Sequence, residues 1–350
     1  MTVTALPSPA AGRPRTVRWL LRLHRPALYA WAGLVAVLAG ALLWLGGPLT
    51  EAAAAAWREY DAGCARGGPC SYDQDAILRY KDVYQYTTFA VLAVPFLVAG
   101  WAGAALTGRE LESGTARLAW TQAVTPARWL AARLAVPAAL VTAGTGLLVL
   151  LHHRAWTAGD GRIETAKTWY DMPTFVSGGP LVLGLALAGL VIGALLGLLL
   201  GRSLVALCAA PLAVAALWTA VQTGLPHLWP AVTRVAGRRT FPEYSGIKVE
   251  EGVVTSTGAH ETTLNCLTDA TTACRRLNDR RGVTGFYVDY HPFSHSWPLH
   301  LAATGLLLTL TALLTVPAFL LLRRRTTGTP GRTPRRTPGL EKTGGAGAAG

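Results

Sequence analysis

The chain alternates between long uncharged apolar runs and shorter polar segments. A helix needs about 20 mainly apolar residues to cross the hydrocarbon core of a bilayer. Six runs reach this length, and we predict that each forms one membrane-spanning helix. The runs occupy residues 27–47, 87–107, 130–151, 180–200, 203–223 and 297–322. Only Gly201 and Arg202 separate the fourth run from the fifth, so these two helices should form a tight hairpin.

The composition agrees with this pattern. Of the 350 residues, 51% are hydrophobic and 15% are charged, whereas an average soluble domain has about 25% charged residues. A water-soluble fold of this size cannot bury apolar runs of this length. We therefore predict an all-α polytopic membrane protein, which excludes a soluble enzyme, a collagen-like chain and a disordered protein.

The positive charge gathers on one side of the predicted membrane. The two tails, the loops after the second and fourth spans and Arg133 near the start of the third span contain 17 of the 32 Lys and Arg residues, but only three of the 19 acids. Such basic flanks favour the cytoplasmic side. Both termini are therefore predicted to be cytoplasmic. The net charge of +13 then reflects orientation, and no nucleic-acid partner is expected.

This topology defines the predicted domains. A basic cytoplasmic tail (1–26) precedes the first five helices (27–223), which carry a cytoplasmic loop at 108–129. An extracytoplasmic loop subdomain (224–296) follows, with β-favouring stretches at 247–255 and 285–290. The sixth helix (297–322) leads into a basic tail (323–350) that is rich in Thr, Pro and Gly, a composition typical of disorder.

The N-terminal tail contains a short basic amphipathic stretch. Its arginines recur at helical spacing on one face, largely opposite Val17, Leu20 and Leu21. They are Arg15, Arg18, Arg22 and Arg25. Such a helix is expected to lie along the membrane surface, with the arginines at anionic lipid headgroups. The alternative is a simple positive flank that only orients the first span.

Four of the five cysteines fall as local pairs in predicted exterior loops. Cys64 and Cys70 share the first loop, and Cys266 and Cys274 share the third. Even numbers of cysteines on an oxidising face are typical of disulfides. We predict a disulfide within each pair, although the sequence also allows pairing between the two loops. The fifth, Cys208, lies within the fifth span, where we expect a small packing residue.

Zinc is the alternative for the third exterior loop. His291 and His295 follow Cys266 and Cys274, and these are zinc-ligand residue types. The cysteine spacing, however, differs from the two to four intervening residues of a zinc finger. Pro292 also disfavours a helix that would present both histidines. We therefore predict no metal site.

The fourth span carries a glycine at every fourth position. Glycine allows close approach of helix backbones in a membrane, where lipid supplies no hydrophobic drive for association. This ladder predicts tight helix packing, within the chain or with a second copy. Its members are Gly189, Gly193, Gly197 and Gly201.

Motifs for catalysis are absent from the sequence. It contains no GxxxxGK[ST] phosphate loop, no HExxH and no GxSxG. The span interiors contain almost no ionisable residue apart from His300 and the near-terminal Arg133, and the adjacent His152 and His153 lie at a predicted membrane edge. No buried carboxylate is present to serve as a proton relay. The chain is not expected to be an enzyme.

The loop at 108–129 is the most informative segment. It runs from Gly108-Arg-Glu through Glu112-x-Gly114-Thr115 to Arg128-Trp129. This loop resembles the signature of ABC-2-type permeases, the membrane subunits of ATP-binding-cassette exporters, and most closely the actinobacterial branch. The late pairs His291-Pro292 and Trp297-Pro298 and the basic cluster 323–325 add to the likeness. Pro126 departs from it, since the family pattern has Arg or Lys there.

The resemblance implies that this loop forms a coupling helix that docks on a separate cytoplasmic ATPase subunit. In that role Glu110 and Glu112 would pair with basic residues of the ATPase, and Trp120 would fill a pocket. The matching positions are Glu110, Glu112, Gly114, Thr115, Trp120, Thr121, Gln122, Val124 and Thr125. The alternative is a solvated loop that merely ends the second span.

By this resemblance the chain is a permease of the bacterial plasma membrane that works as a homodimer or heterodimer. It binds no cofactor itself, because ATP and magnesium belong to the ATPase subunits, and membrane lipids surround it. An apolar lining fits lipid-like or amphipathic substrates, although the sequence does not identify one. Two alternatives stay open: a membrane-embedded sensor or accessory protein that uses the exterior subdomain, and an ion-coupled carrier.

Overall fold

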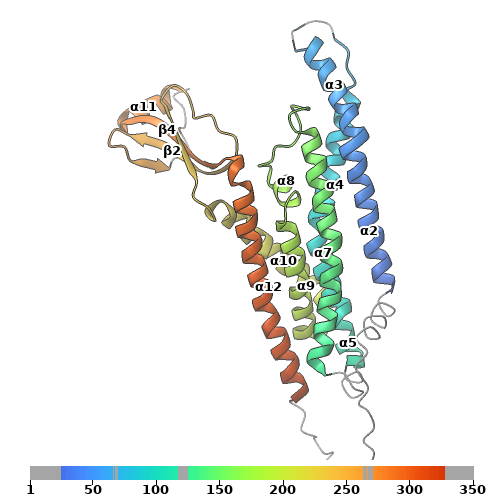
Figure 1. Cartoon of the computed structure of the whole chain (residues 1–350). Coiled ribbons are helices and arrows are strands. Elements are labelled where there is room, and N and C mark those ends of the chain that lie inside the picture. Colours follow the sequence, from blue (N-terminus) through green and yellow to red (C-terminus); the bar gives the residue numbers. More distant parts are fainter. Residues whose placement is uncertain are drawn as a thin grey trace, which may run out of the picture.

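The computed structural model describes residues 25–65, 67, 70–116, 125–262, 266 and 271–327. This part of the chain is mostly helical, and six of its helices are long and apolar enough to cross a membrane. The long helices run side by side in one bundle, with a small sheet at one end (Figure 1). The prediction of six spans is therefore confirmed.

The first two spans are longer than the apolar pattern predicted. Helices α2 (Arg25–Trp44), η1 (Leu45–Leu49) and α3 (Thr50–Gly63) follow one another without a break over 39 residues. Helices α4 (Gln74–Trp101), η2 (Ala102–Gly108) and α5 (Arg109–Glu112) do the same. Residues 48–86, which the hydropathy pattern leaves between the first two spans, are therefore mostly helical.

Alanine explains the extension of the first helix. The segment Thr50–Gly63 contains a run of five alanines, which have the highest helix propensity but little hydrophobicity. Pro48 precedes it inside η1, a π-helical turn, and such a wider turn absorbs the irregularity that proline introduces. The Thr50 hydroxyl donates to the Leu45 carbonyl at 2.6 Å. A disulfide between Cys64 and Cys70, whose Cα atoms are 5.1 Å apart, joins the end of α3 to the segment before α4.

The remaining spans are α7 (Pro126–Gly159), α9 (Leu181–Leu200), α10 (Ser203–Gly224) and α12 (Ser296–Thr327). Helix α9 lies at the centre, in contact with α4, η2, α7, α10 and α12. Thirteen of its 20 residues are buried, whereas α10 buries three of 22. Cys208, which we expected to be a small packing residue, is exposed on the surface of α10 in this single chain.

The segment between the last two spans forms a four-stranded antiparallel sheet. Its strands are β1 (Val232–Gly237), β2 (Ile247–Thr255), β3 (His260–Thr262) and β4 (Val283–His291), in the order β1-β4-β2-β3. The short turns η3 (Leu225–His227) and η4 (Phe293–His295) connect it to α10 and α12, and α11 (Thr272–Arg280) precedes β4. Val253, Val283 and Phe286 form its small core.

Two cysteines and two histidines of this sheet region are held by contacts within the chain. Cys266 and Cys274 form a disulfide with Cα atoms 5.1 Å apart. His291 Nε2 lies 2.8 Å from the Pro226 carbonyl, and its Nδ1 lies 3.2 Å from Nδ1 of His295. Burial lowers the pKa of His291, and its ring links β4 to η3 through the Pro226 carbonyl.

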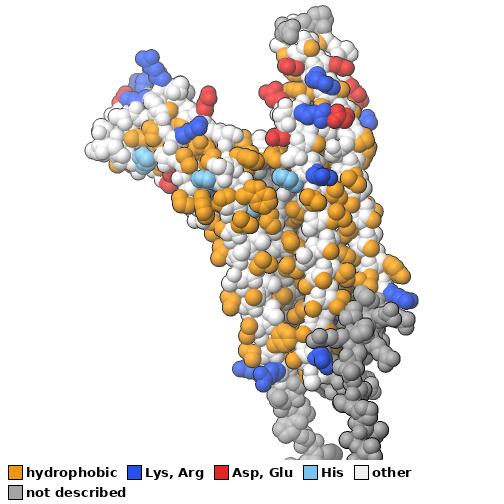
Figure 2. Space-filling model, in the orientation of Figure 1, with side chains coloured by type: hydrophobic (Ala, Val, Ile, Leu, Met, Phe, Trp, Pro, Cys, Tyr) orange, Lys and Arg blue, Asp and Glu red, His pale blue; other side chains and the backbone are white. Residues whose placement is uncertain are grey.

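The bundle has two chemically different ends. At the α5 end, the charged side chains visible in Figure 2 are basic, whereas the α3 hairpin and the sheet at the opposite end carry both signs. Apolar side chains cover much of the surface between the ends. Helix α8 (Met172–Ser177) and the sheet lie at the end opposite α5 (Figure 1).

Candidate functional site

A buried ion pair ties two spans together at the α5 end. The Arg133 guanidinium in α7 contacts the Glu110 carboxylate in α5 at 2.5 Å. It also donates to the Leu106 carbonyl in η2 at 3.2 Å and lies 4.7 Å from the centroid of the Trp129 ring. Arg133 is only 3% exposed and Glu110 16%. This cluster, which we call the α5 clamp, fastens the end of the second span to the third.

A second carboxylate of the same short helix reaches another span. Glu112 Oε2 accepts from the backbone N–H of Ser203 at 3.0 Å and from its hydroxyl at 2.6 Å. Arg202, which precedes Ser203, supplies no side-chain cap to α10. Glu112 therefore caps α10 from outside, where a negative charge also suits the positive end of the helix dipole.

A sharp turn follows α5 at residues 113–115, near the end of the described range 70–116. Gly114 has φ of +73°, a conformation that glycine adopts readily. The hydroxyls of Ser113 and Thr115 are 2.9 Å apart across this turn. On the far side, Thr125 caps α7 by accepting from the Arg128 N–H at 3.4 Å. Pro126 is the first residue of α7, a position where proline suits a helix because its fixed φ is helical and no N–H is needed there.

The structure assigns in-chain contacts to several residues that the sequence linked to an ATPase. Glu110 binds Arg133 and Glu112 binds Ser203, so both carboxylates fasten spans together within the chain. Thr125 is a helix cap. Other predicted positions lie outside the described residues: Trp120, Thr121, Gln122 and Val124 of the loop, and Arg15, Arg18 and Arg22 of the tail. Arg25 begins α2.

Sequence reasoning missed Arg133 as a site residue, because a basic residue near the end of a span was taken as a sign of orientation. A signal was nevertheless available. Ionisable residues within apolar runs face the protein interior and pair with another group. The acid at Glu110 was a candidate for that pairing.

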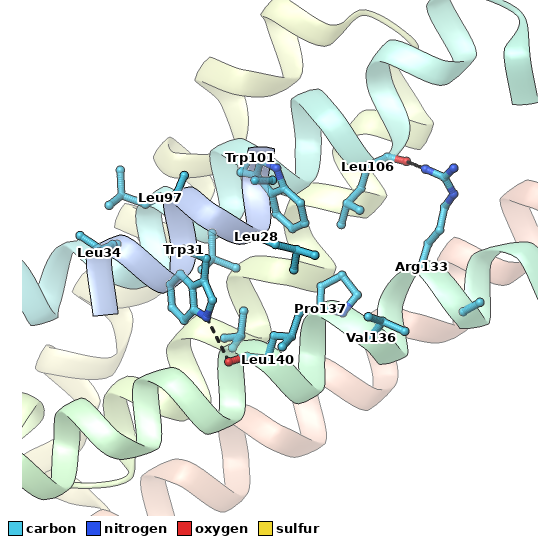
Figure 3. Close-up of a pocket in the computed structure, with 15 residues that line it drawn as sticks. Leu28, Trp31, Leu34, Leu97, Trp101, Leu106, Arg133, Val136, Pro137 and Leu140 are labelled. Atoms are coloured by element: carbon cyan, nitrogen blue, oxygen red, sulfur yellow. Dashed lines mark hydrogen bonds between the residues drawn. The ribbon is translucent and has the colours of Figure 1, made fainter. Parts of the chain in front are cut away.

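An apolar cavity of about 240 Å³ lies next to the α5 clamp. Helices α2, α4 and α7 and the η2 turn form its walls, and Figure 3 shows Trp31, Leu97, Leu106 and Leu140 around it. Arg133 is the one charged residue among the described residues that line it. The cavity and the clamp therefore share Arg133 and Leu106.

A tryptophan holds one wall of this cavity in place. Trp31 Nε1 in α2 donates to the Leu140 carbonyl in α7 at 3.2 Å (Figure 3). Gly144, one turn further along α7, leaves room for the indole, since a Cβ there would lie within 3 Å of the ring. The contact bridges α2 and α7 across the side of the cavity away from the clamp.

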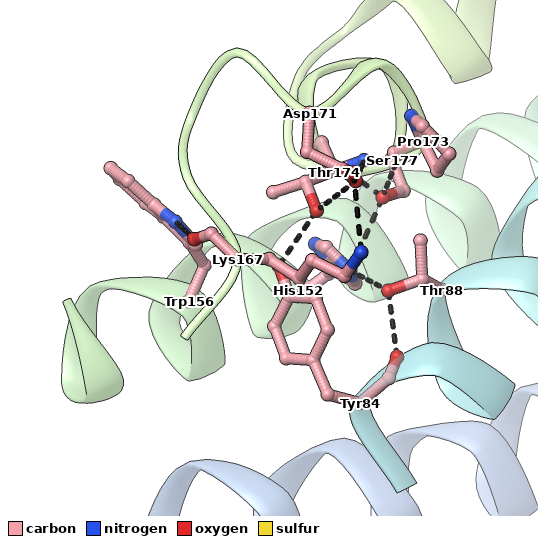
Figure 4. Close-up of polar contacts among 9 residues, drawn as sticks. All are labelled: Tyr84, Thr88, His152, Trp156, Lys167, Asp171, Pro173, Thr174 and Ser177. Atoms are coloured by element: carbon pink, nitrogen blue, oxygen red, sulfur yellow. Dashed lines mark hydrogen bonds and ion pairs between the residues drawn. The ribbon is translucent and has the colours of Figure 1, made fainter. Parts of the chain in front are cut away.

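The opposite end of α7 carries a buried polar cluster around His152. His152 is fully buried, and its Nε2 lies 2.9 Å from the Thr88 hydroxyl and 3.2 Å from that of Ser177. Beside it, the Tyr84 hydroxyl donates to Thr174 at 3.2 Å. Figure 4 shows how these groups join α4, α7 and α8. Sequence analysis treated His152 as an edge residue; the structure instead makes it the centre of this cluster.

The glycine ladder of α9 faces the second span of the same chain. A Cβ on Gly189 would lie 2.6 Å from the Pro95 carbonyl oxygen, and one on Gly193 or Gly197 would meet the backbone of α4 or η2 even more closely. Gly201 has another role, because it ends α9 with φ of +60°. In the described ranges no group of three His, Cys, Asp or Glu residues could hold a metal.

The family comparison covers most of these features. Residues 32–225 match the family described as "ABC-2 membrane transporter related", a range that includes the α5 clamp, most of the cavity lining, the His152 cluster and the glycine ladder. No curated protein and no solved structure shows significant similarity to the chain. Because the match spans more than half of the sequence, the chain belongs to the ABC-2 membrane transporter related family and is a multi-pass membrane permease component of an ABC transporter.

Proposed function

We propose that this chain is the permease subunit of an ABC exporter and binds a separate ATPase at its α5 end. In this proposal the α5 end faces the cytoplasm of a bacterium, and the sheet lies outside its plasma membrane. The basic flanks Arg25, Arg202 and 323–325 support that orientation. ATP and magnesium are bound by the ATPase, and this chain supplies the path through the membrane.

One observation carries the proposal: α5 is fastened to three spans. It continues α4 without a break, its Glu110 binds Arg133 of α7, and its Glu112 caps α10. A displacement of the segment that follows α5 would therefore be transmitted to α4, α7 and α10 together. Coupling of ATP hydrolysis to transport needs such a rigid connection between the docking segment and the spans.

Two permease chains, identical or different, would pair with two ATPase subunits, and the substrate would pass between the permeases. The apolar cavity beside the clamp favours an amphipathic or lipid-like substrate. The sensor alternative would use the sheet as its binding module, and the ion-coupled carrier would need a titratable group in the path.

The test separates docking from internal fastening. Trp120→Ala should weaken co-purification of the ATPase about 5- to 150-fold, since an aromatic anchor at an interface is worth about 1–3 kcal/mol. Glu112→Lys alters both the surface charge and the cap of α10. Ser203→Ala is its matched control, because it weakens the cap and leaves the Glu112 carboxylate in place.

Transport-stimulated ATP turnover should fall in Trp120→Ala while the spans stay folded. If Ser203→Ala reproduces Glu112→Lys, Glu112 acts through the internal joint; if only Glu112→Lys loses the ATPase, it also contacts the partner. Full ATPase association and transport in both Trp120→Ala and Glu112→Lys would refute docking at this loop. The sensor alternative would then become the stronger one.

A further inference from the structure

The cavity beside the α5 clamp combines a long apolar wall with one buried charged group at its end. Arg133 lies nearest the α5 end, whereas Leu34, Leu97 and Val141 line the part deeper in the bundle. Between Arg133 and Val141 helix α7 rises about 12 Å. Leu97 is also 55% exposed on the bundle surface, so the cavity reaches the lipid-facing side of the protein.

The charge of Arg133 is already compensated. Its guanidinium contacts the Glu110 carboxylate and the Leu106 carbonyl. An anionic ligand that pairs with Arg133 would have to displace Glu110, and a cationic ligand would find no carboxylate free to pair with it, because Glu110 already binds Arg133. Both arrangements leave a buried charge without its partner, which is strongly unfavourable. A ligand with an uncharged head avoids this problem.

One donor of the same side chain is nevertheless unsatisfied. Arg133 Nε is buried and has no hydrogen-bond partner, although buried polar groups in folded proteins are nearly always paired. Leaving such a donor unpaired is unfavourable, because its lost hydration is not replaced. A hydroxyl, ether or ester oxygen of an uncharged head would satisfy it without disturbing the clamp.

We propose that this cavity binds a single-tailed amphiphile with an uncharged head. The tail lies among α2, α4 and α7, and an oxygen acceptor of the head binds Arg133 Nε. The head then contacts the same Arg133 guanidinium that binds Glu110. Binding of the ligand in the cavity would therefore act directly on the ion pair that fastens α5. The inference deepens the proposed transport function and names its ligand class, but the binding itself requires no ATPase.

The test uses the purified full chain in lipid nanodiscs and three photoreactive probes. Each probe has the same diazirine-bearing dodecyl tail, with a glycerol ester, a sulfate or an ammonium head. Peptide mapping should place the glycerol-ester label on α2 or α7 around Trp31 and Leu140, saturably and in competition with the unlabelled ester. The sulfate and ammonium probes should label these segments at least about tenfold less at equal concentration.

Two variants check the two parts of the site. Val136→Trp fills the cavity and should reduce labelling by the glycerol ester about tenfold or more. Leu150→Trp, at an exposed position of the same helix, is the matched control and should label normally. The paired change Arg133→Met with Glu110→Met removes donor and charge together, and it should abolish the preference for the glycerol ester over a head-less dodecyl probe.

Stronger labelling by the sulfate probe would overturn the uncharged-head assignment. Unsaturable labelling, or equal labelling of Leu150→Trp and Val136→Trp, would show that the cavity holds only ordinary bilayer lipid, and would overturn the site. These results do not depend on the ATPase. If the proposed transport function is wrong, the ATPase should fail to associate with the chain, while specific labelling of the cavity stays intact.

Discussion

The second span has two faces that are packed in opposite ways. On one face, α4 and η2 press against the glycine ladder of α9, where Gly193 and Gly197 leave no room for a side chain. On the other face, the same helix meets α2 and α7 across a cavity of about 240 Å³. The first contact is backbone against backbone, whereas the second depends on the α5 clamp and the Trp31 hydrogen bond.

The difference indicates which parts can move relative to each other. Close contact of backbones along several turns resists sliding and separation, because every shift creates clashes or voids. A contact held by a few polar groups around a cavity has fewer interactions to rearrange. We therefore expect α4, α9 and α10 to move as one unit, and α2 to shift most readily against it, while the α5 clamp keeps α7 linked to α4.

The clamp should be the most sensitive point of the loosely packed face. Arg133→Leu leaves the Glu110 carboxylate in a largely buried site without a partner, which we expect to lower the free energy of unfolding by about 3–5 kcal/mol. The measurement is denaturant unfolding of the purified protein. Adding Glu110→Leu should recover most of the loss; if the double variant is as unstable as Arg133→Leu alone, the ion pair is not the cause.

On the tightly packed face, Gly193→Leu should destabilise the protein by up to about 3 kcal/mol. The added side chain meets the carbonyl of Ala99, which cannot rotate away. Thermal unfolding followed by circular dichroism would measure the effect. Gly40→Leu is the matched control, because no atom lies near the position of its Cβ in α2. Equal effects of the two changes would mean that α9 does not seal against α4.

Filling the cavity should stabilise the protein, in contrast to the two preceding substitutions. Val136→Trp adds apolar surface where space exists, and cavity-filling changes commonly stabilise proteins by about 0.5–2 kcal/mol. Ligand-free protein should therefore melt at a higher temperature than the parent. A marked decrease in melting temperature would indicate that the two walls already meet closely, and the contrast between the faces would disappear.

The smallest effect is expected for the bridge across the cavity. Trp31→Phe keeps an aromatic ring in the space beside Gly144 but removes the hydrogen bond to the Leu140 carbonyl. One such bond contributes about 1 kcal/mol. Faster amide exchange in the middle of α7, with exchange in α9 unchanged, would locate the loosened contact on this face; uniform change in both helices would contradict it.

The apolar runs were sufficient to predict the six spans, because a membrane-spanning helix needs a long uncharged segment. They were insufficient for the helix ends. Residues Thr50–Gly63 and the start of α4 contain charges and alanines. Their mean hydropathy is therefore too low to mark a span, although the helix continues through them. Hydropathy reports where a bilayer could surround a helix, and it gives no information about the part that stands in water.

The contacts of the candidate site depended on tertiary structure. Sequence spacing showed that the glycines of α9 share one face, but only the fold identifies α4 as their neighbour. Arg133 and Glu110 are separated by a loop and meet because α7 returns alongside η2. His152 lies next to a predicted membrane edge, and its burial follows from α8 folding back over it. Such pairings depend on loop geometry, which local patterns do not encode.

The length of the second span has a mechanical consequence. A helix of 39 residues is about 58 Å long, roughly twice the thickness of the hydrocarbon core. If it pivots within the membrane, its two ends sweep in opposite directions. A rotation of about 5° would displace either end by about 2–3 Å from a central pivot. The end of α4 next to the Cys64–Cys70 disulfide would then move whenever α5 is displaced. A movement of α5 on one side of the bilayer would thus change the position of this end on the other side.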